Sequence, residues 1–316
     1  MITEPGIYEM SDADYQADPC EEISLRSSYV AKLLEKGSTP AHVAYQIPRI
    51  NPDYKREEKR HFDIGKAAHT LLLGRGAAYA IVHADSYRTK AAQEERDLIY
   101  LSHKTPLLET EAVQVRAMVK AARRQIDELI EAESVPCDPF DSAYTEKVIV
   151  WRDPITNVLC RAMLDGLPIM EDFVGEYKTD GQSAALENFQ WKARKMGYIA
   201  RLAFYRRGLE ALKIAFSPTI GMFVQETFEP YLLAYHRITD ELIERADREV
   251  TAAMKLWRKC LETGKWPGYS AEGYVLDLTE RERQAEYGES NQNPIITHHV
   301  MSEDLPDDVY SKVTFK

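Results

Sequence analysis

The chain has 316 residues, 44% of them hydrophobic, and its formal net charge is −11. This apolar content is enough for a packed core and excludes a wholly disordered chain. The acidic charge excludes a protein that coats nucleic acid through charge alone, because neutralising phosphates requires lysine and arginine.

The first half of the chain is predicted to be mainly helical, after a polar lead-in over residues 1–22. A plausible N-cap at Ser24, a helix-starting proline at Pro40 and closing glycines at Gly74 and Gly76 mark several boundaries. A charged connector separates the early helices from the later ones. The expected helices cover residues 24–34, a short stretch from Pro40, residues 62–73 and residues 109–132, and the connector covers residues 51–60.

The second half begins with β-branched segments that predict three strands in an antiparallel meander. A long helix, a strand-like segment interrupted at Glu229-Pro230 and a final helix follow. The strands are expected at 144–151, 158–167 and 173–178, with a turn at 153–157, and the later elements at 184–214, 222–238 and 240–263. This order predicts a mixed α/β (α+β-like) fold, with a mainly antiparallel or mixed central sheet flanked by helices. We expect one domain over residues 1–275 and an acidic tail over 276–316.

Targeting and metal-cluster signals are missing from the sequence. No stretch approaches the ~20 consecutive apolar residues of a transmembrane helix, and the first residues lack the basic and apolar regions of a signal peptide. We therefore expect a cytoplasmic protein with no membrane contact. The cysteines are too scattered for a zinc or iron–sulfur site and are expected to be reduced and structural. They are Cys20, Cys137, Cys160 and Cys260.

Strand alternation places three charged residues together at the ends of the second and third strands. Asp165 faces one side of its strand, and Glu176 and Lys178 share a face while Tyr177 points away. Two carboxylates so close would resist ionisation unless a cation lay between them. Oxygen ligands suit Mg²⁺, with Mn²⁺ as a substitute, and the main-chain carbonyl of Tyr177 is a further candidate ligand. Such a metal can polarise a phosphate and activate water.

This three-residue pattern also has an ordinary structural interpretation. An aspartate at a strand end often forms a turn, and a glutamate and lysine two residues apart often form a solvated face. However, Asp165 lies in an apolar strand, where a buried charge requires a partner.

The segments RAMLDGLP and GEYKTDG resemble the paired motifs of the PD-(D/E)XK nucleases. More narrowly, the chain resembles the RecE-type branch, the nuclease domain of exodeoxyribonuclease VIII, which is similar in fold to lambda exonuclease. The resemblance covers about residues 20–275 and extends to further segments in the same order. These are SSYVAKLLEKGSTPAHVAYQ, DIGKAAHTLLLG, GYIARLAFYRRG, FVQETFEPYLLAYHRI and ETGKWPGYS.

The resemblance implies a restriction-endonuclease-like core and assigns roles by position. His69, Asp165 and Glu176 match metal-binding residues, and Lys178 matches the catalytic lysine. Tyr205 matches the last tyrosine of a helical motif. Without the resemblance, His69 would be interpreted as a core histidine, since its neighbours are apolar.

The helical motif contains one departure from the family. Tyr198, Arg201 and Tyr205 are spaced i, i+3 and i+7 and so share a helix face. The family usually has glutamine at the position of Arg201, and an arginine there brings positive charge towards the metal. It is a candidate contact to the scissile or 5′ phosphate, and it leaves the usual geometry in question.

Further candidates extend the site towards DNA. Glu146 is a candidate member of the acidic cluster, with an ordinary surface carboxylate as the alternative. Arg26 and Ser28 are candidate contacts for a terminal 5′ phosphate, by analogy with lambda exonuclease. The other candidates belong either to a strand-guiding channel or to a solvated helix face. They are Arg161, Arg194, Lys195, Tyr198, Arg206 and Arg207.

The resemblance implies a Mg²⁺-dependent 5′–3′ exonuclease that degrades linear double-stranded DNA and leaves a 3′ single strand for recombination. It also implies a phage or prophage origin, a homo-oligomeric ring (trimer or tetramer) and a single-strand annealing recombinase as partner. Three alternatives remain. One is an endonuclease or Cas4-like end-processing nuclease, although the clustered cysteines of that branch are missing. The others are a DNA-binding or regulatory protein without turnover, and a general hydrolase with paired carboxylates.

Overall fold

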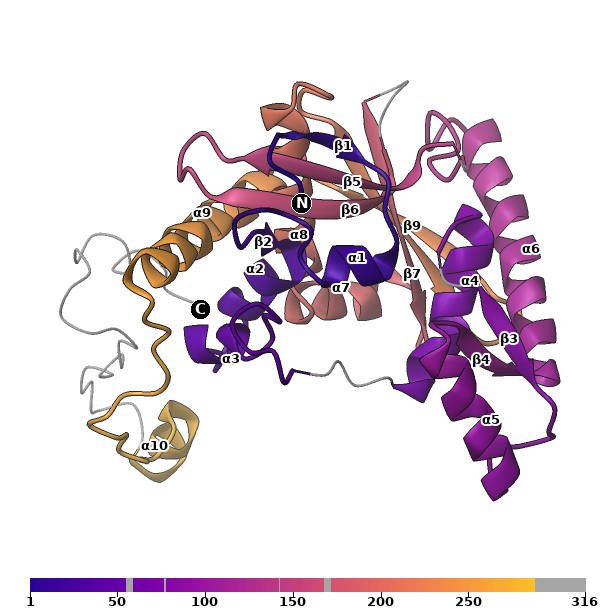
Figure 1. The fold of residues 1–316 in the computed structure, drawn as a ribbon, viewed down its shortest axis with the longest axis horizontal. Helices are drawn as coiled ribbons and strands as arrows, with labels where there is room; N and C mark the ends of the chain where they lie inside the picture. Colours follow the sequence, from indigo (N-terminus) through magenta and orange to yellow (C-terminus); the bar gives the residue numbers. More distant parts are fainter. Residues whose placement is uncertain (55–58, 77, 142, 168–171, 288–316) are drawn as a thin grey trace.

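The computed structural model describes residues 1–54, 59–76, 78–141, 143–167 and 172–287. Three small sheets are surrounded by helices (Figure 1). In strand order these sheets are β1-β5-β6-β2, β7-β8-β9 and β3-β4. The predicted mixed α/β class is confirmed. In the part of the chain that the structure describes, we find no helix with the length and apolar character that a bilayer crossing requires.

The N-terminal segment, expected as a polar lead-in to the fold, forms regular elements. It contains β1 (Gly6–Tyr8), helix α1 (Asp12–Gln16) and β2 (Leu25–Arg26). β1 pairs antiparallel with β5, and β2 pairs parallel with β6. Long-range pairing therefore orders this segment, whose own composition is too polar to predict it.

Ser24 does not cap the first predicted helix. That helix, α2 (Ser27–Leu34), begins three residues later, with Arg26 at its N-cap position and no side-chain cap. Ser24 is instead buried, and its hydroxyl donates to Asp18 at 2.7 Å. The Ser24 hydroxyl therefore makes a tertiary contact with Asp18 instead of capping the helix.

The remaining predicted helices of the first half are present. Three elements that were not predicted, β3, α5 and β4, lie between α4 and α6 in the chain. β3 and β4 pair in parallel and pack with α4 and α6. The bounds are α3 (Pro40–Ala44), η1 (Arg60–Phe62), α4 (Asp63–Leu73), β3 (Tyr79–Val82), α5 (Lys90–Leu101), β4 (Thr105–Leu108) and α6 (Glu109–Glu131).

The three central strands are present, but the predicted meander is wrong. β5 (Thr145–Arg152) and β6 (Leu159–Gly166) pair antiparallel as expected. β7 (Phe173–Asp180), however, pairs in parallel with β8 (Thr219–Glu226), which pairs antiparallel with β9 (Leu233–Ile238). β7 and β8 are almost completely buried, as parallel strands covered on both faces usually are.

The long helix expected over residues 184–214 is two helices, α7 (Leu186–Lys195) and α8 (Tyr198–Ala211). Gly197 separates them with a left-handed φ of 66°, and a Cβ at Gly197 would lie 2.9 Å from the Ala31 side chain. Both the backbone conformation and the close approach require glycine. The last predicted helix, α9 (Asp240–Thr263), is confirmed, and α10 (Glu280–Tyr287) lies in the predicted tail.

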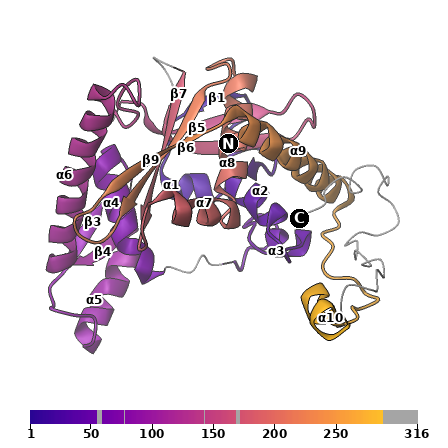
Figure 2. The same cartoon turned by 180° about the vertical axis from the view of Figure 1, so that it is seen from behind.

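The main hydrophobic core lies between the strands and helices α2, α8 and α9. The indole rings of Trp151 and Trp257 are fully buried in it. Figure 2 shows α9 and α6 on opposite sides of the strands β7 and β9. The strand β7, which carries Glu176 and Lys178, therefore lies between these two helices.

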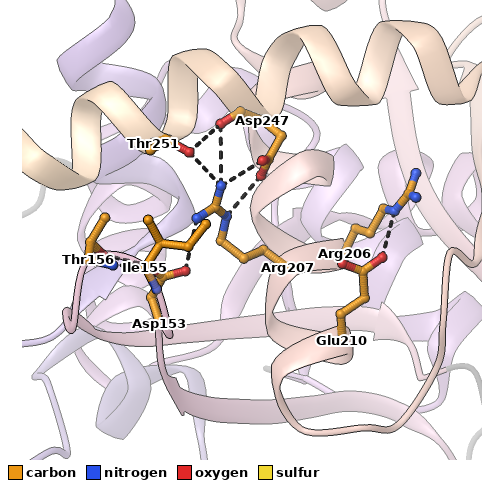
Figure 3. Close-up of polar contacts among 8 residues, drawn as sticks. All are labelled: Asp153, Ile155, Thr156, Arg206, Arg207, Glu210, Asp247 and Thr251. Carbon is orange, nitrogen blue, oxygen red and sulfur yellow. Dashed lines mark hydrogen bonds and ion pairs between the residues drawn. The ribbon is translucent and has the colours of Figure 1, made fainter. Parts of the chain in front are cut away.

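Arg207 forms a buried ion-pair network between α8, α9 and the β5–β6 turn (Figure 3). Its guanidinium lies 3.0 Å from Asp153 and 2.6 Å from Asp247, and it donates to Thr251 at 2.6 Å. The neighbouring Arg206 pairs with Glu210 at 2.9 Å. Both arginines were candidate DNA contacts. Their side chains are engaged in ion pairs within the protein, so this interpretation is not supported.

Asp153→Asn should make the stability of the protein less dependent on acid pH. Burial opposes ionisation of Asp153, but hydrogen bonds from Thr156 and the Arg207 charge together lower its pKa. Because its pKa is lower in the folded protein, ionised Asp153 stabilises the fold at pH values above the unfolded carboxyl pKa of about 4. This stabilisation is lost as the pH falls through the lower, folded-state pKa. The measurement is the free energy of unfolding in urea at pH 7 and at pH 3. Asp240→Asn, which removes an exposed carboxylate paired with Arg206, is the control and should keep the wild-type pH dependence.

Candidate functional site

The end of β6 lies against the middle of β7, although the two strands belong to different sheets. The main-chain N–H of Tyr177 on β7 donates to Asp165 Oδ2 on β6 at 2.8 Å. This bond fixes the Asp165 carboxylate against the middle of β7. The predicted convergence of the two strands is therefore present, through one side-chain bridge instead of a β-ladder.

Lys178 lies between the two predicted carboxylates. Its ammonium nitrogen is 2.6 Å from Glu176 Oε1 and 3.6 Å from Asp165 Oδ2. It also donates to the main-chain carbonyl of Tyr177 at 2.9 Å. The Tyr177 side chain points the other way, into a second hydrophobic cluster. The alternation predicted for this strand thus matches the structure.

His69 reaches the same place from helix α4. Its Nε2 lies 2.9 Å from Asp165 Oδ1, and its Nδ1 lies 3.5 Å from Glu146 Oε1 on β5. Glu146 has a positive φ of 50°, an uncommon conformation for this residue type. Four elements that are distant in sequence therefore bring three carboxylates, one imidazole and one ammonium group together.

The mixture of charges shifts the protonation equilibria of these groups in different directions. Burial opposes ionisation of Asp165, but the charges of Lys178 and His69 hold the pKa of that carboxyl well below its usual range. Burial and the neighbouring Asp165 raise the pKa of Glu176. Burial alone would lower the pKa of His69, but Asp165 and Glu146 together raise it to about 10. The site therefore favours cations, and Glu176 is the carboxyl that most lacks compensation.

The donor groups fit a divalent cation of the Mg²⁺ type. Glu176 Oε2 is buried and has no hydrogen-bond partner in the described part of the chain. Within the described ranges, no three His, Cys, Asp or Glu side chains form a ready metal site. The expected set would therefore combine Asp165 and Glu176 with the Tyr177 carbonyl and water, as is usual for Mg²⁺.

Helix α8 adds the predicted aromatic and cationic residues. Tyr205 is buried, and burial together with the charge of Glu176 raises its pKa to about 12. Burial opposes the charge of Arg201, but Tyr205 and Glu176 outweigh this and raise its pKa. The Nε of Arg201 is buried and has no partner among the described residues. Tyr198, one turn earlier, is partly buried, and its ring stacks on Phe189 with centroids 6.2 Å apart.

Tyr15 on α1 is a site neighbour that the sequence did not predict. It is 7% exposed, and its ring lies under the Arg161 guanidinium at 5.2 Å. Burial raises its pKa, while the charges of Arg161, Arg26 and Arg201 oppose this rise. The N-terminal segment therefore contributes to the surroundings of Arg201. Ser11 before the acidic residues Asp12 and Asp14 is a helix-start signal that could have indicated this element.

Arg161 does not lie where a DNA contact is available. Its side chain is fully buried and lies 3.0 Å from Asp18, and it donates to the Ser24 carbonyl at 2.7 Å and to the Tyr15 carbonyl at 3.2 Å. A guanidinium engaged in this way cannot reach a phosphate without breaking the N-terminal packing. The prediction that Arg161 binds DNA is not supported by its position.

The other predicted DNA contacts remain accessible. Arg26 is partly buried, donates to Gln16 and lies over the Tyr29 ring at 4.2 Å. Ser28 is exposed in the first turn of α2, and Arg194 is exposed on α7. Their roles stay predictions.

Comparison with known proteins identifies similar folds. No family model and no curated protein matches the sequence. A provisionally named exonuclease from Eubacterium rectale matches with a TM-score of 0.55 at 11% identity, over 90% of this chain and 100% of that one. A phage-related exonuclease from Haemophilus somnus 129PT has 11% identity and a TM-score of 0.29, over 77% of this chain and 97% of that one. An alkaline exonuclease from Laribacter hongkongensis has 14% identity and a TM-score of 0.24, over 62% and 96%.

Only the first of these likenesses is strong enough to support an argument, and at this identity it concerns the fold. It covers 90% of this chain. This chain therefore has the fold of a solved protein named as an exonuclease, and the mixed α/β architecture that the resemblance to PD-(D/E)XK nucleases implied is confirmed.

Proposed function

We propose that this protein is a metal-dependent nuclease that hydrolyses DNA from the ends of linear duplexes. One observation carries the proposal: two buried, oppositely charged groups at one site each keep an atom that has no partner among the described residues. These atoms are Glu176 Oε2 and Arg201 Nε. A cation beside the carboxylate and an anion beside the guanidinium would satisfy both. A phosphodiester bound together with a divalent cation has both properties.

The residues of the site then take distinct roles. Asp165, Glu176 and the Tyr177 carbonyl would hold Mg²⁺, with His69 beside Asp165. When bound, this ion would polarise the phosphate and make a water nucleophilic near neutral pH. The Lys178 ammonium, which already contacts Glu176 and Asp165, orients that water and stabilises the negative charge that develops on the phosphate.

Arg201 and Tyr205 act on the site from α8. The guanidinium would bind a phosphate oxygen through Nε, with Tyr205 beside it on the same helix face. Arginine suits phosphate better than glutamine does, because its donors are charged and arranged as a planar fork. The departure from the family pattern is thus compatible with turnover.

We infer the direction of digestion, 5′ to 3′, from the start of α2. Arg26 and the exposed Ser28 flank the first turn of this helix, which has no side-chain cap. Main-chain N–H groups at a helix start suit a terminal phosphate. The resemblance further supports a 3′ single-stranded product used in recombination, a phage or prophage setting, a trimeric or tetrameric ring and an annealing recombinase as partner.

The deciding experiment compares linear 5′-phosphorylated duplex DNA with closed circular DNA, each in Mg²⁺ or in EDTA. Only the linear substrate in Mg²⁺ should be degraded, and Mn²⁺ should replace Mg²⁺. Equal cleavage of circles would indicate an endonuclease instead. Binding of linear DNA without any degradation would indicate a DNA-binding protein that keeps the fold but lacks turnover.

A further inference from the structure

Trp191 on α7 is highly exposed, although large aromatic side chains usually pack in the core. Its side chain is 75% exposed, whereas Trp151 and Trp257 are fully buried. α7 turns its buried face inward through Phe189 and Ala193. At about 100° per residue, Trp191 lies opposite that face and points directly into solvent. A large aromatic ring at the outermost position of a helix contributes nothing to the core.

Two cations accompany this ring on the same side of α7. Arg194 and Lys195 follow Trp191 by three and four residues, so they are its neighbours on the helix surface. Both are exposed, and within the described ranges neither forms an ion pair. Arg194 donates to the Gln190 carbonyl at 3.0 Å. We call Trp191, Arg194 and Lys195 the Trp191 face; the acidic residue near it is Glu187, one turn towards the helix start.

The Trp191 face is connected directly to the catalytic strand. Lys192, next to Trp191 in sequence, pairs with Asp180 at 2.7 Å, and Asp180 lies at the end of β7, two residues after Lys178. At the other end of α7, Gly197 packs against Ala31 of α2. Helix α7 packs against α8 (Figure 1). The Trp191 face therefore extends along the outer surface of the helix that joins the catalytic strand to the α2 region.

We propose that the Trp191 face binds single-stranded DNA, with an unpaired base stacked on the indole and the adjacent phosphates at Arg194 and Lys195. The combination selects this ligand: the cations require an anionic chain, and stacking on a flat ring requires a base that is not enclosed in a duplex. Such a local positive charge is notable on a chain with a net charge of −11. The strand bound here is the one that digestion leaves, so this proposal rests on the proposed function.

The test measures binding of a labelled oligothymidylate in EDTA, where no cleavage occurs. Trp191→Ala should weaken binding roughly 10-fold or more, and Trp191→Phe, which keeps a ring, should weaken it less. Arg194→Glu with Lys195→Glu should weaken binding and reduce its dependence on salt. Leu186→Ala, at another exposed apolar position of α7 (59% exposed), is the matched control and should bind as the wild type does. Saturating oligonucleotide should also change the tryptophan fluorescence of the wild type but not that of Trp191→Phe.

Equal affinities of the wild type and Trp191→Ala for the oligonucleotide would overturn the proposal. A change in oligomeric state in Trp191→Ala, with unchanged oligonucleotide binding, would overturn it too and identify the face as a contact between copies of the chain. Because binding is measured in EDTA, the result is independent of turnover. A failed degradation assay together with Trp191-dependent binding would refute the nuclease proposal alone.

Discussion

Lys178→Ala should lower the rate of linear duplex degradation by roughly 10²–10³-fold, the usual effect of removing one donor that stabilises developing charge. The ammonium contacts both Glu176 and Asp165 and belongs to the catalytic strand. Its loss removes a fixed positive charge at the position where the phosphate would acquire negative charge. The measurement is the initial rate of nucleotide release from a 5′-phosphorylated linear duplex in Mg²⁺.

The chain offers a matched control in Lys192→Ala. Lys192 is also a partly exposed lysine paired with a buried carboxylate, Asp180, at the end of the same strand. It lies outside the group of residues around Asp165. Its replacement should leave the rate within a few-fold of the wild type. If both lysine variants retained the wild-type rate, with circular dichroism showing intact folds, the assignment of the site would be wrong.

Arg161→Met should destabilise the protein by about 3–5 kcal/mol, the usual cost of leaving one partner of a buried ion pair uncompensated. Arg161 and Asp18 have side-chain exposures of 0% and 2%, and their charged atoms lie 3.0 Å apart. The variant also leaves the carbonyls of Tyr15 and Ser24 without their donor. Urea denaturation gives the change in the free energy of unfolding.

The double variant Asp18→Asn with Arg161→Met should regain part of this loss, because no isolated charge stays buried. Arg194→Ala, at an exposed position, should change stability by no more than about 0.5 kcal/mol. A fully stable Arg161→Met protein with weakened DNA binding would instead restore the interpretation of Arg161 as a DNA contact.

The convergence of Asp165, Glu176 and Lys178 was predictable because it depends on local alternation along two strands. The way in which the strands meet was not. β7 pairs with β8, a strand more than forty residues later, and touches β6 through the bond from Tyr177 to Asp165. Parallel pairing of β7 and β8 depends on the burial of both strands. The sequence of one strand alone does not show which other strand it will pair with.

Other differences have equally specific causes. Gly197 was included in one long helix because its neighbours have helical spacing, but its positive φ and its contact with Ala31 end α7 there. Arg161 was assigned to DNA because it is basic and close to the motif, whereas the side chains around it make it structural. Tyr15 lies in a polar segment without a hydrophobic pattern, so its position beside Arg201 follows from tertiary contacts alone.

The buried contacts of Arg161 also have a consequence for synthesis of the protein. Its guanidinium donates to the Tyr15 carbonyl across 146 positions of sequence. The segment around Tyr15 therefore cannot take its final place until β6 has been made. Because β6 precedes β7 in the chain, this segment can dock before Glu176 and Lys178 have been made.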